Sequence, residues 1–191
     1  LNGSDLFNEA LGAAHAFTIE TSLKTELYVA AADIDAVRAC KTSIQFKEID
    51  LNNRTLADAI KDLDFEIVVV HDAQRPLTRS AQFHRTLEAM LNEVDAARPT
   101  MAFTETLKSM NENSEITRTF DRTKIRRVSS PEIIRKKAID FEAIPQGWAL
   151  PLKENVATAE VEADPESLRI NSVNEVTLME AFLHWQQRVV N

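Results

Sequence analysis

The sequence predicts a three-layer α/β fold with a mostly parallel β-sheet. Helix-like and strand-like patterns alternate four times through the first part of the chain, and such alternation is typical of sheets whose strands are joined by helical crossovers. One strand, residues 66–72, is a continuous apolar run, as expected for a strand that is buried on both faces. The length of 191 residues, the 44% hydrophobic content and the lack of a repeat or linker predict one domain over 1–191.

The first part of the chain supplies the alternating elements. Leu6, Leu11 and Phe17 are among the apolar residues at helical spacing that predict a helix over 5–17. In a sheet of this type ligands bind beyond the carboxyl ends of the strands, so the segment after Val70 is a candidate site. The elements after the first helix are a strand at 26–31, a helix at 34–41, a strand at 43–50, a helix at 54–63, the strand at 66–72, a helix at 80–97 and a strand at 100–107.

The next segment is expected to form an arm that projects from the body. Two short, charged strand candidates, 115–121 and 124–130, would pair as a β-hairpin within an arm of approximately 108–128. Eight basic and two acidic residues lie within 117–137, in a chain whose net charge is −8. This basic segment is either a solvated charged face or a binding site for an anionic substrate such as a phosphate.

The C-terminal part is expected to contain two helices. Pro131 at a first helical position predicts a helix over 131–139. Ser172 and Glu175 form a capping box that predicts the start of a helix over 173–190. The segments between these helices are expected to be a solvated loop or sheet edge at 154–166 and a strand at 167–171.

The composition excludes several classes of function. The acidic net charge disfavours nucleic acid and anionic membranes as partners, and no apolar run approaches the ~20 residues of a membrane span. The single cysteine, Cys40, cannot form an internal disulfide, which predicts a cytoplasmic protein. Only three glycines are present, Gly3, Gly12 and Gly147, so the glycine-rich dinucleotide fingerprint and the Walker A loop are both excluded.

The segment His71-Asp72-Ala73-Gln74-Arg75-Pro76-Leu77 directly follows the apolar strand. It resembles the V-H-D-A-A-R-P motif of the cytidylyltransferases of the methylerythritol phosphate pathway, with Gln74 in place of the second alanine. The resemblance covers nearly the whole chain and is strongest at 66–77 and 104–122. Further segments match the family in the same order: Arg54 before a helix, Thr104-Glu105-Thr106-Leu107-Lys108, Thr119-Phe120-Asp121-Arg122, Ser130-Pro131-Glu132 and Leu168-Arg169-Ile170-Asn171.

This resemblance implies a Rossmann-like nucleotidyltransferase fold with a protruding β-hairpin arm, and a homodimer formed through that arm. It also implies an enzyme that uses Mg²⁺ to transfer CMP from CTP to methylerythritol 4-phosphate or a similar sugar-alcohol phosphate, with release of pyrophosphate. The attacking phosphate oxygen is already anionic. Such a reaction depends on holding two anions in line and neutralising charge, and much less on acid–base chemistry.

The resemblance also assigns roles to individual residues. Asp72 and Arg169 are the expected catalytic residues, and Asp72 is the expected metal ligand. Arg122 is expected to hold the acceptor phosphate across a dimer interface, because a guanidinium presents a fork of donors that suits phosphate. The remaining expected substrate-binding residues are Thr106, Arg75, Arg54 and Ala73.

Structural roles are the alternatives for several of these residues. Asp72 could cap the turn that follows it, and Arg122 could be an ordinary surface charge of an arm. Arg75 could pin the loop after Asp72, and Arg54 could be a surface charge at a helix start. Each alternative needs no substrate.

The sequence also departs from the family. Arg169 replaces a lysine, Ala57 replaces a serine that contacts the base, and no segment matches the alanine- and glycine-rich loop that wraps the CTP phosphates. That loop is expected either to precede Leu1 in the natural protein or to have been lost. The alternatives to a working enzyme are therefore a diverged, non-catalytic homologue that keeps dimerisation and ligand binding, or a protein-interaction module that uses the basic arm.

Overall fold

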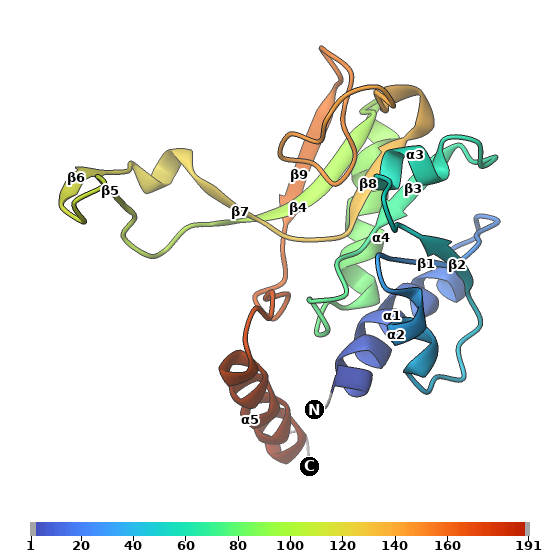
Figure 1. Ribbon diagram of the computed structural model, residues 1–191, viewed down its shortest axis with the longest axis horizontal. Helices are drawn as coiled ribbons and strands as arrows, with labels where there is room; N and C mark the ends of the chain where they lie inside the picture. Colours follow the sequence, from blue (N-terminus) through green and yellow to red (C-terminus); the bar gives the residue numbers. More distant parts are fainter. Residues whose placement is uncertain (1–2, 190–191) are drawn as a thin grey trace.

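The computed structural model describes residues 3–189 and has an α/β architecture (Figure 1). The helices are α1 (Gly3–Glu20), α2 (Ile34–Ala39), α3 (Leu56–Ile60), α4 (Ser80–Ala89) and α5 (Val173–Val189), with short 3₁₀ helices at Met90–Asn92, Arg122–Lys124 and Lys136–Ala138. The strands are β1 (Tyr28–Ala31), β2 (Lys47–Asp50), β3 (Ile67–Val70), β4 (Ala96–Ala102), β5 (Lys108–Met110), β6 (Ile116–Thr119), β7 (Arg126–Val128), β8 (Glu132–Arg135) and β9 (Thr158–Glu162).

The main sheet is built around β4. Along one edge of β4 run β7 and then β8, both antiparallel to it, and β9 runs parallel along the other edge. On its far side β8 pairs antiparallel with β3. A separate parallel pair joins β1 to β2, and an antiparallel pair joins β5 to β6. The expectation of an α/β fold is confirmed, but the expectation of a mostly parallel sheet is wrong for this five-stranded sheet.

The cause of this error is β8, which lies where the sequence predicts a helix over 131–139. Glu132–Arg135 extends between β3 and β4 and supplies hydrogen bonds to both. Ile133 and Ile134 are both fully buried, one on each side of the sheet. A helix at this position would leave the facing edges of β3 and β4 without backbone partners. Pairing between distant segments therefore outweighs the local helix-start signal of Pro131.

Several other elements also differ from those predicted. The helix expected over 80–97 ends at Ala89, followed by one 3₁₀ turn, because Glu93 takes a left-handed conformation with φ of 62°. The strand expected at 100–107 instead starts at Ala96. The strand expected at 167–171 does not form. The acidic stretch 154–166 contains β9, an edge strand of the sheet.

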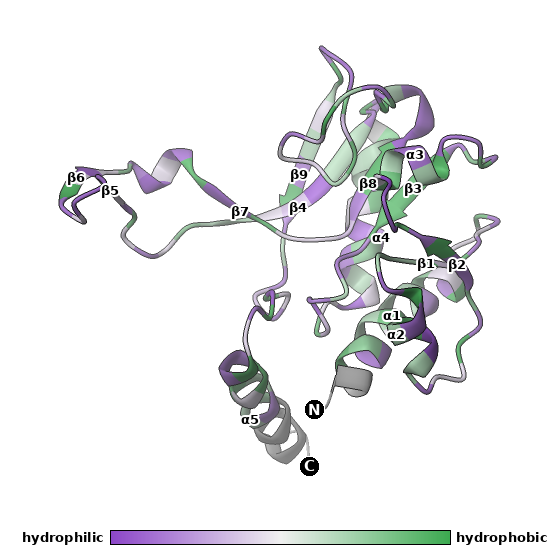
Figure 2. Ribbon diagram, in the orientation of Figure 1, coloured by the Kyte–Doolittle hydropathy of each residue, from purple (hydrophilic) through white to green (hydrophobic). Residues whose placement is uncertain are grey.

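Side chains on both faces of the main sheet are covered. Ala96 and Ile134 face a core cluster with Ile60 of α3 and Leu150. Their neighbours Ala97 and Ile133 face the opposite cluster, with Met90 at the end of α4. Figure 2 shows hydrophobic residues along β3, whereas α4 carries both hydrophobic and hydrophilic residues.

A protruding arm is confirmed, although its pairing differs from that predicted. The chain leaves the sheet at the end of β4, forms the small β5–β6 hairpin, and returns as β7 (Figure 1). The segments 115–121 and 124–130, expected to pair with each other, pair instead with β5 and β4. Residues 111–124 are exposed throughout, so local side-chain burial does not select their partners. Among the described residues, no helix is long and apolar enough to cross a membrane.

Aromatic contacts join α1, α4 and the end of β3. Phe83 on α4 is buried, and its ring centroid lies 5.4 Å from that of Phe17 on α1. His71 follows β3, and its ring centroid lies 5.0 Å from that of Phe83. His71 Nδ1 hydrogen-bonds to Ser130 Oγ at 2.9 Å, while Nε2 is buried with no partner among the described residues. This burial lowers the pKa of His71 from 6.5 to about 4, so the ring is neutral near pH 7.

Phe83→Ala is expected to destabilise the protein strongly, because it removes the ring on which Phe17 and His71 pack. The expected loss in the free energy of unfolding is about 3–5 kcal/mol. Denaturant unfolding measures it, with Leu91→Ala as the control, because Leu91 is 78% exposed. A loss no larger than that of the control would show that this cluster does not hold α1 to α4.

His71 is expected to make stability depend on pH. Its folded pKa of about 4 lies below the unfolded value of 6.5, so between these pH values the unfolded chain binds more protons. The stabilising contribution is complete above pH 6.5 and is lost as the pH falls toward 4, by roughly 3 kcal/mol. Burial raises the pKa of Glu132, which gives a pH dependence of the opposite sign.

The variant His71→Asn isolates this contribution, because it keeps a polar side chain but removes the titration. Denaturant unfolding of both proteins at pH 4.5 and 7.5 is the measurement. The loss on acidification should be larger in the protein with His71, whereas Glu132 contributes equally to both. Equal losses in the two proteins would contradict the assignment to His71.

Candidate functional site

Asp72 lies at the carboxyl end of β3, where the sequence places the candidate site. Its Oδ1 accepts a hydrogen bond from the backbone N–H of Gln74 at 3.0 Å. Its Oδ2 accepts from Arg169 Nε at 2.8 Å and lies 3.7 Å from Arg75 Nε. One carboxylate oxygen therefore caps the turn, as the structural alternative predicts, while the other pairs with a cation from a segment 97 residues away.

Arg169 is held by three acceptors. Besides Asp72, it donates through Nη1 to Asn171 Oδ1 at 2.6 Å and through Nη2 to Gln74 Oε1. The side chain of Arg169 remains 47% exposed. Its cation is thus fixed beside Asp72 at the surface, where a ligand can reach it.

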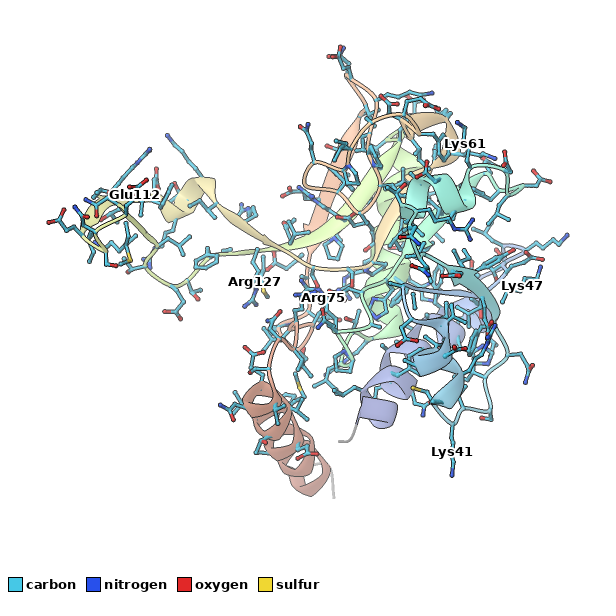
Figure 3. All side chains as sticks on the ribbon, in the orientation of Figure 1. Lys41, Lys47, Lys61, Arg75, Glu112 and Arg127 are labelled. Atoms are coloured by element: carbon cyan, nitrogen blue, oxygen red, sulfur yellow. The ribbon has the colours of Figure 1, made fainter. Side chains whose placement is uncertain are left out.

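Arg75 is directed inward and ties the loop after β3 to two other segments. It donates through Nη1 to the carbonyl of Ser167 at 2.8 Å and through Nη2 to the carbonyl of Val128 at 2.9 Å. Burial lowers the pKa of the Arg75 guanidinium, and the charge of Asp72 opposes this effect. Figure 3 shows Arg75 near Arg127, at the base of the arm. These contacts hold the loop in the way that the structural alternative expects, and a substrate-binding role for Arg75 stays a prediction.

A buried polar network underlies the site. Gln82 of α4 has no exposed surface, and its Nε2 donates to the Ser130 carbonyl at 2.6 Å and to Ser167 Oγ at 3.2 Å. Ser167 Oγ also contacts Ser129 Oγ at 2.6 Å and Thr78 Oγ1 at 2.7 Å. Ser130 Oγ in turn accepts from the backbone N–H of Asp72 at 3.2 Å. This network joins α4, the turn before β8 and the segment before Arg169.

This network is not recognisable from the sequence. The available signal is the position of Gln82, which lies directly beside Phe83 and one turn before Thr86, and all three are buried on α4. A glutamine on the buried side of a helix needs hydrogen-bond partners. The sequence does not show which of its serines supply them.

Ala73 and Arg54 occupy different surroundings. Ala73 is exposed in the same loop as Asp72. Arg54 donates through Nε to the Asp50 carbonyl at 2.6 Å and lines a hollow of about 580 Å³ beyond the ends of β1 and β2. Asp72, Arg75 and Arg169 are not among the residues that line this hollow.

Thr106 and Arg122 lie on the arm and are exposed. Arg122 donates through Nη1 to the carbonyl of Thr104 at 2.9 Å, which keeps its guanidinium within the arm. The structure therefore brings together Asp72, Arg75 and Arg169, whereas the arm, which carries Thr106 and Arg122, projects away from the main sheet (Figure 1). Within the described residues no group of three His, Cys, Asp or Glu side chains could form a metal site.

The chain resembles known proteins in both sequence and structure. Residues 50–151 match the family model described as IspD: 2-C-methyl-D-erythritol 4-phosphate cytidylyltransferase. A bifunctional enzyme IspD/IspF from Rhodopseudomonas palustris is 36% identical over 70 residues, covering 37% of this chain and 17% of the relative. A 2-C-methyl-D-erythritol 4-phosphate cytidylyltransferase from Frankia casuarinae is 26% identical over 128 residues, covering 64% of this chain and 48% of the relative. The chain thus spans less than half the length of these relatives.

Solved structures share the fold. The 4-diphosphocytidyl-2C-methyl-D-erythritol synthase from Anaerococcus prevotii matches with a TM-score of 0.72 at 17% identity, over 94% of this chain and 89% of the other. The 2-C-methyl-D-erythritol 4-phosphate cytidylyltransferase from Thermus thermophilus matches with a TM-score of 0.68 at 19% identity, over 95% and 90%. Because the family model matches more than half of its residues, the chain belongs to the 2-C-methyl-D-erythritol 4-phosphate cytidylyltransferase family.

Proposed function

We propose that this protein transfers CMP from CTP to methylerythritol 4-phosphate or a similar sugar-alcohol phosphate and releases pyrophosphate. The observation that carries the proposal is the pair formed by Asp72 and Arg169, 2.8 Å apart at the carboxyl end of β3. Asp72 stands in the segment that resembles the family motif, and family membership supports the same reaction. The proposal therefore combines a charged pair with a segment that resembles the family motif.

The reaction needs two anions to meet in line. An oxygen of the acceptor phosphate attacks the α-phosphorus of CTP, the new O–P bond forms, and the bond from that phosphorus to the pyrophosphate oxygen breaks. The attacking oxygen is already deprotonated, so no side chain has to remove a proton. Arg169 is the cation that attracts these anions, while Asp72 holds the guanidinium and accepts hydrogen bonds from substrate hydroxyls.

Asp72 also fits the way in which Mg²⁺ is usually held beside a nucleotide. Magnesium is commonly bound by one or two carboxylates together with substrate phosphates and water. Asp72 offers one such carboxylate, and its Oδ1 accepts only the Gln74 N–H among the described residues. Mg²⁺ bound there would neutralise negative charge on the CTP phosphates.

We further propose that the arm of a second copy completes each site in a homodimer. Thr106 and Arg122 are exposed on the arm and lack contacts to Asp72 in their own chain. The arm also exposes Met110 and Ile116, at 59% and 66%. A two-stranded hairpin is at best marginally stable by itself, so a partner surface would stabilise it.

Asp72→Asn is expected to reduce pyrophosphate release from CTP and methylerythritol 4-phosphate by about 100-fold in kcat/KM, because it removes the charge that orients Arg169. The full-length protein with Mg²⁺ is assayed, and Asp62→Asn, which changes an exposed residue elsewhere, is the control. If the folded wild-type protein releases no pyrophosphate, the proposal is wrong. A shift in Tm with CTP but no turnover would instead indicate a ligand-binding homologue.

Arg122→Ala is expected to raise KM for the acceptor by about 10-fold or more, because a cation that contacts its phosphate is lost. Arg118→Ala, another exposed arginine of the arm, is the control. When the acceptor is well below its KM, mixing Asp72→Asn with Arg122→Ala should raise the rate to about a quarter of the wild-type rate, since half of the random dimers then contain one intact site. No recovery after verified exchange of subunits would contradict a site shared between copies.

A further inference from the structure

Gln74 is the residue of the Asp72 loop that differs from the family motif, and it contacts Arg169 directly. Its side-chain Oε1 accepts a hydrogen bond from Arg169 Nη2. Its backbone carbonyl accepts from the N–H of Ile170 at 2.8 Å, the residue after Arg169. Gln74 thus holds both the backbone and the guanidinium of the segment that carries the cation.

We propose that Gln74, together with Asn171, is a positioning residue that holds the Arg169 guanidinium against Asp72 for binding of the acceptor phosphate. This inference rests on the proposed function for its substrate, and on the three contacts of Arg169 for its geometry. Neither amide needs to touch the substrate. Their role is to restrict the motion of a long side chain that is 47% exposed even with these contacts.

The chemistry of the three acceptors explains why amides suit this position. Asp72 contributes one negative charge, whereas the amide oxygens of Gln74 and Asn171 accept hydrogen bonds without adding charge. A second carboxylate would orient the guanidinium equally well but would cancel the positive potential that attracts a phosphate. Neutral amides orient Arg169 and leave that potential in place.

The number of donors also leaves room for a ligand. A guanidinium has five N–H groups, and the described residues take three of them, one on each nitrogen. Two N–H groups, on Nη1 and Nη2, stay available for phosphate oxygens. A lysine in the same place would present a single ammonium nitrogen, which is a point charge without the planar fork of a guanidinium. The three acceptors, which each bond a different nitrogen of Arg169, could not hold it in the same way. The Gln74 amide therefore matches an arginine better than a lysine.

Kinetics of two substitutions at Gln74 separate orientation from charge. Gln74→Ala should raise KM for the acceptor about 3- to 10-fold, because one of three restraints on Arg169 is lost. Gln74→Glu should raise it further, although it retains an acceptor, because it adds a negative charge beside the phosphate. Gln45→Ala, at an exposed glutamine before β2, is the control. An unchanged KM in both Gln74 variants would overturn the proposal.

A double-mutant cycle with Arg169→Lys tests whether Gln74 acts through Arg169. In the Arg169→Lys background, Gln74→Ala should cause no further change in KM, because the guanidinium that it orients is absent. The same fold-change in both backgrounds would overturn the proposal, since Gln74 would then act independently of Arg169.

A spectroscopic measurement tests the positioning without any turnover. The Nε–H resonance of Arg169, identified by its loss in Arg169→Lys, should be resolved and slow to exchange in the wild-type protein. In Gln74→Ala it should broaden or exchange at least several-fold faster. An unchanged resonance would overturn the positioning role whether or not the protein transfers CMP. A changed resonance in a protein without transfer activity would support positioning while the proposed function fails.

Discussion

The geometry of the candidate site depends on satisfying one buried amide. Gln82 is fully enclosed, and a buried polar group without partners costs several kcal/mol. Its Nε2 donates to the Ser130 carbonyl and the Ser167 hydroxyl, and its Oε1 accepts from the backbone N–H of Asp164. These bonds bring the turn before β8 next to the segment after β9. The backbone N–H of Asp72 donates to Ser130 in the first of these segments, and Arg75 donates to Ser167 in the second. The position of the loop after β3 therefore depends on the hydrogen bonds of this amide.

The amphipathic and apolar patterns were sufficient to predict α1, β1, α2, α3 and β3, because each of these elements carries its own signal. The capping box at Ser172 also predicted the start of α5, and its reciprocal hydrogen bonds with Glu175 are present. That Glu132–Arg135 forms the strand β8 was not predictable in this way. Its four residues fit either a short helix or a strand, and the choice is made by β3 and β4, which need partners on their facing edges.

The site was predictable only to the extent that its residues belong to a recognisable segment. Asp72 and Arg169 were both expected at the site from the family resemblance, and the structure brings them together. The role of Gln74 could not be read from the sequence, where it is only an unexpected residue, because its partner lies 95 positions away. The serines around Gln82 gave no signal for a related reason, since hydroxyl contacts between distant segments have no local pattern. The catalytic and substrate-binding roles expected for all of these residues remain predictions, namely those of Asp72, Arg169, Thr106, Arg122, Arg75, Arg54 and Ala73.

Arg75 couples two parts of the molecule that could otherwise move separately. One of its hydrogen bonds reaches Val128, at the end of the strand that returns from the arm, and another reaches Ser167, two residues before Arg169. Bending at the root of the arm would therefore have to break a partly buried hydrogen bond or carry the Arg169 segment along. Any tilting of the arm that keeps both hydrogen bonds would move the cation beside Asp72 as well.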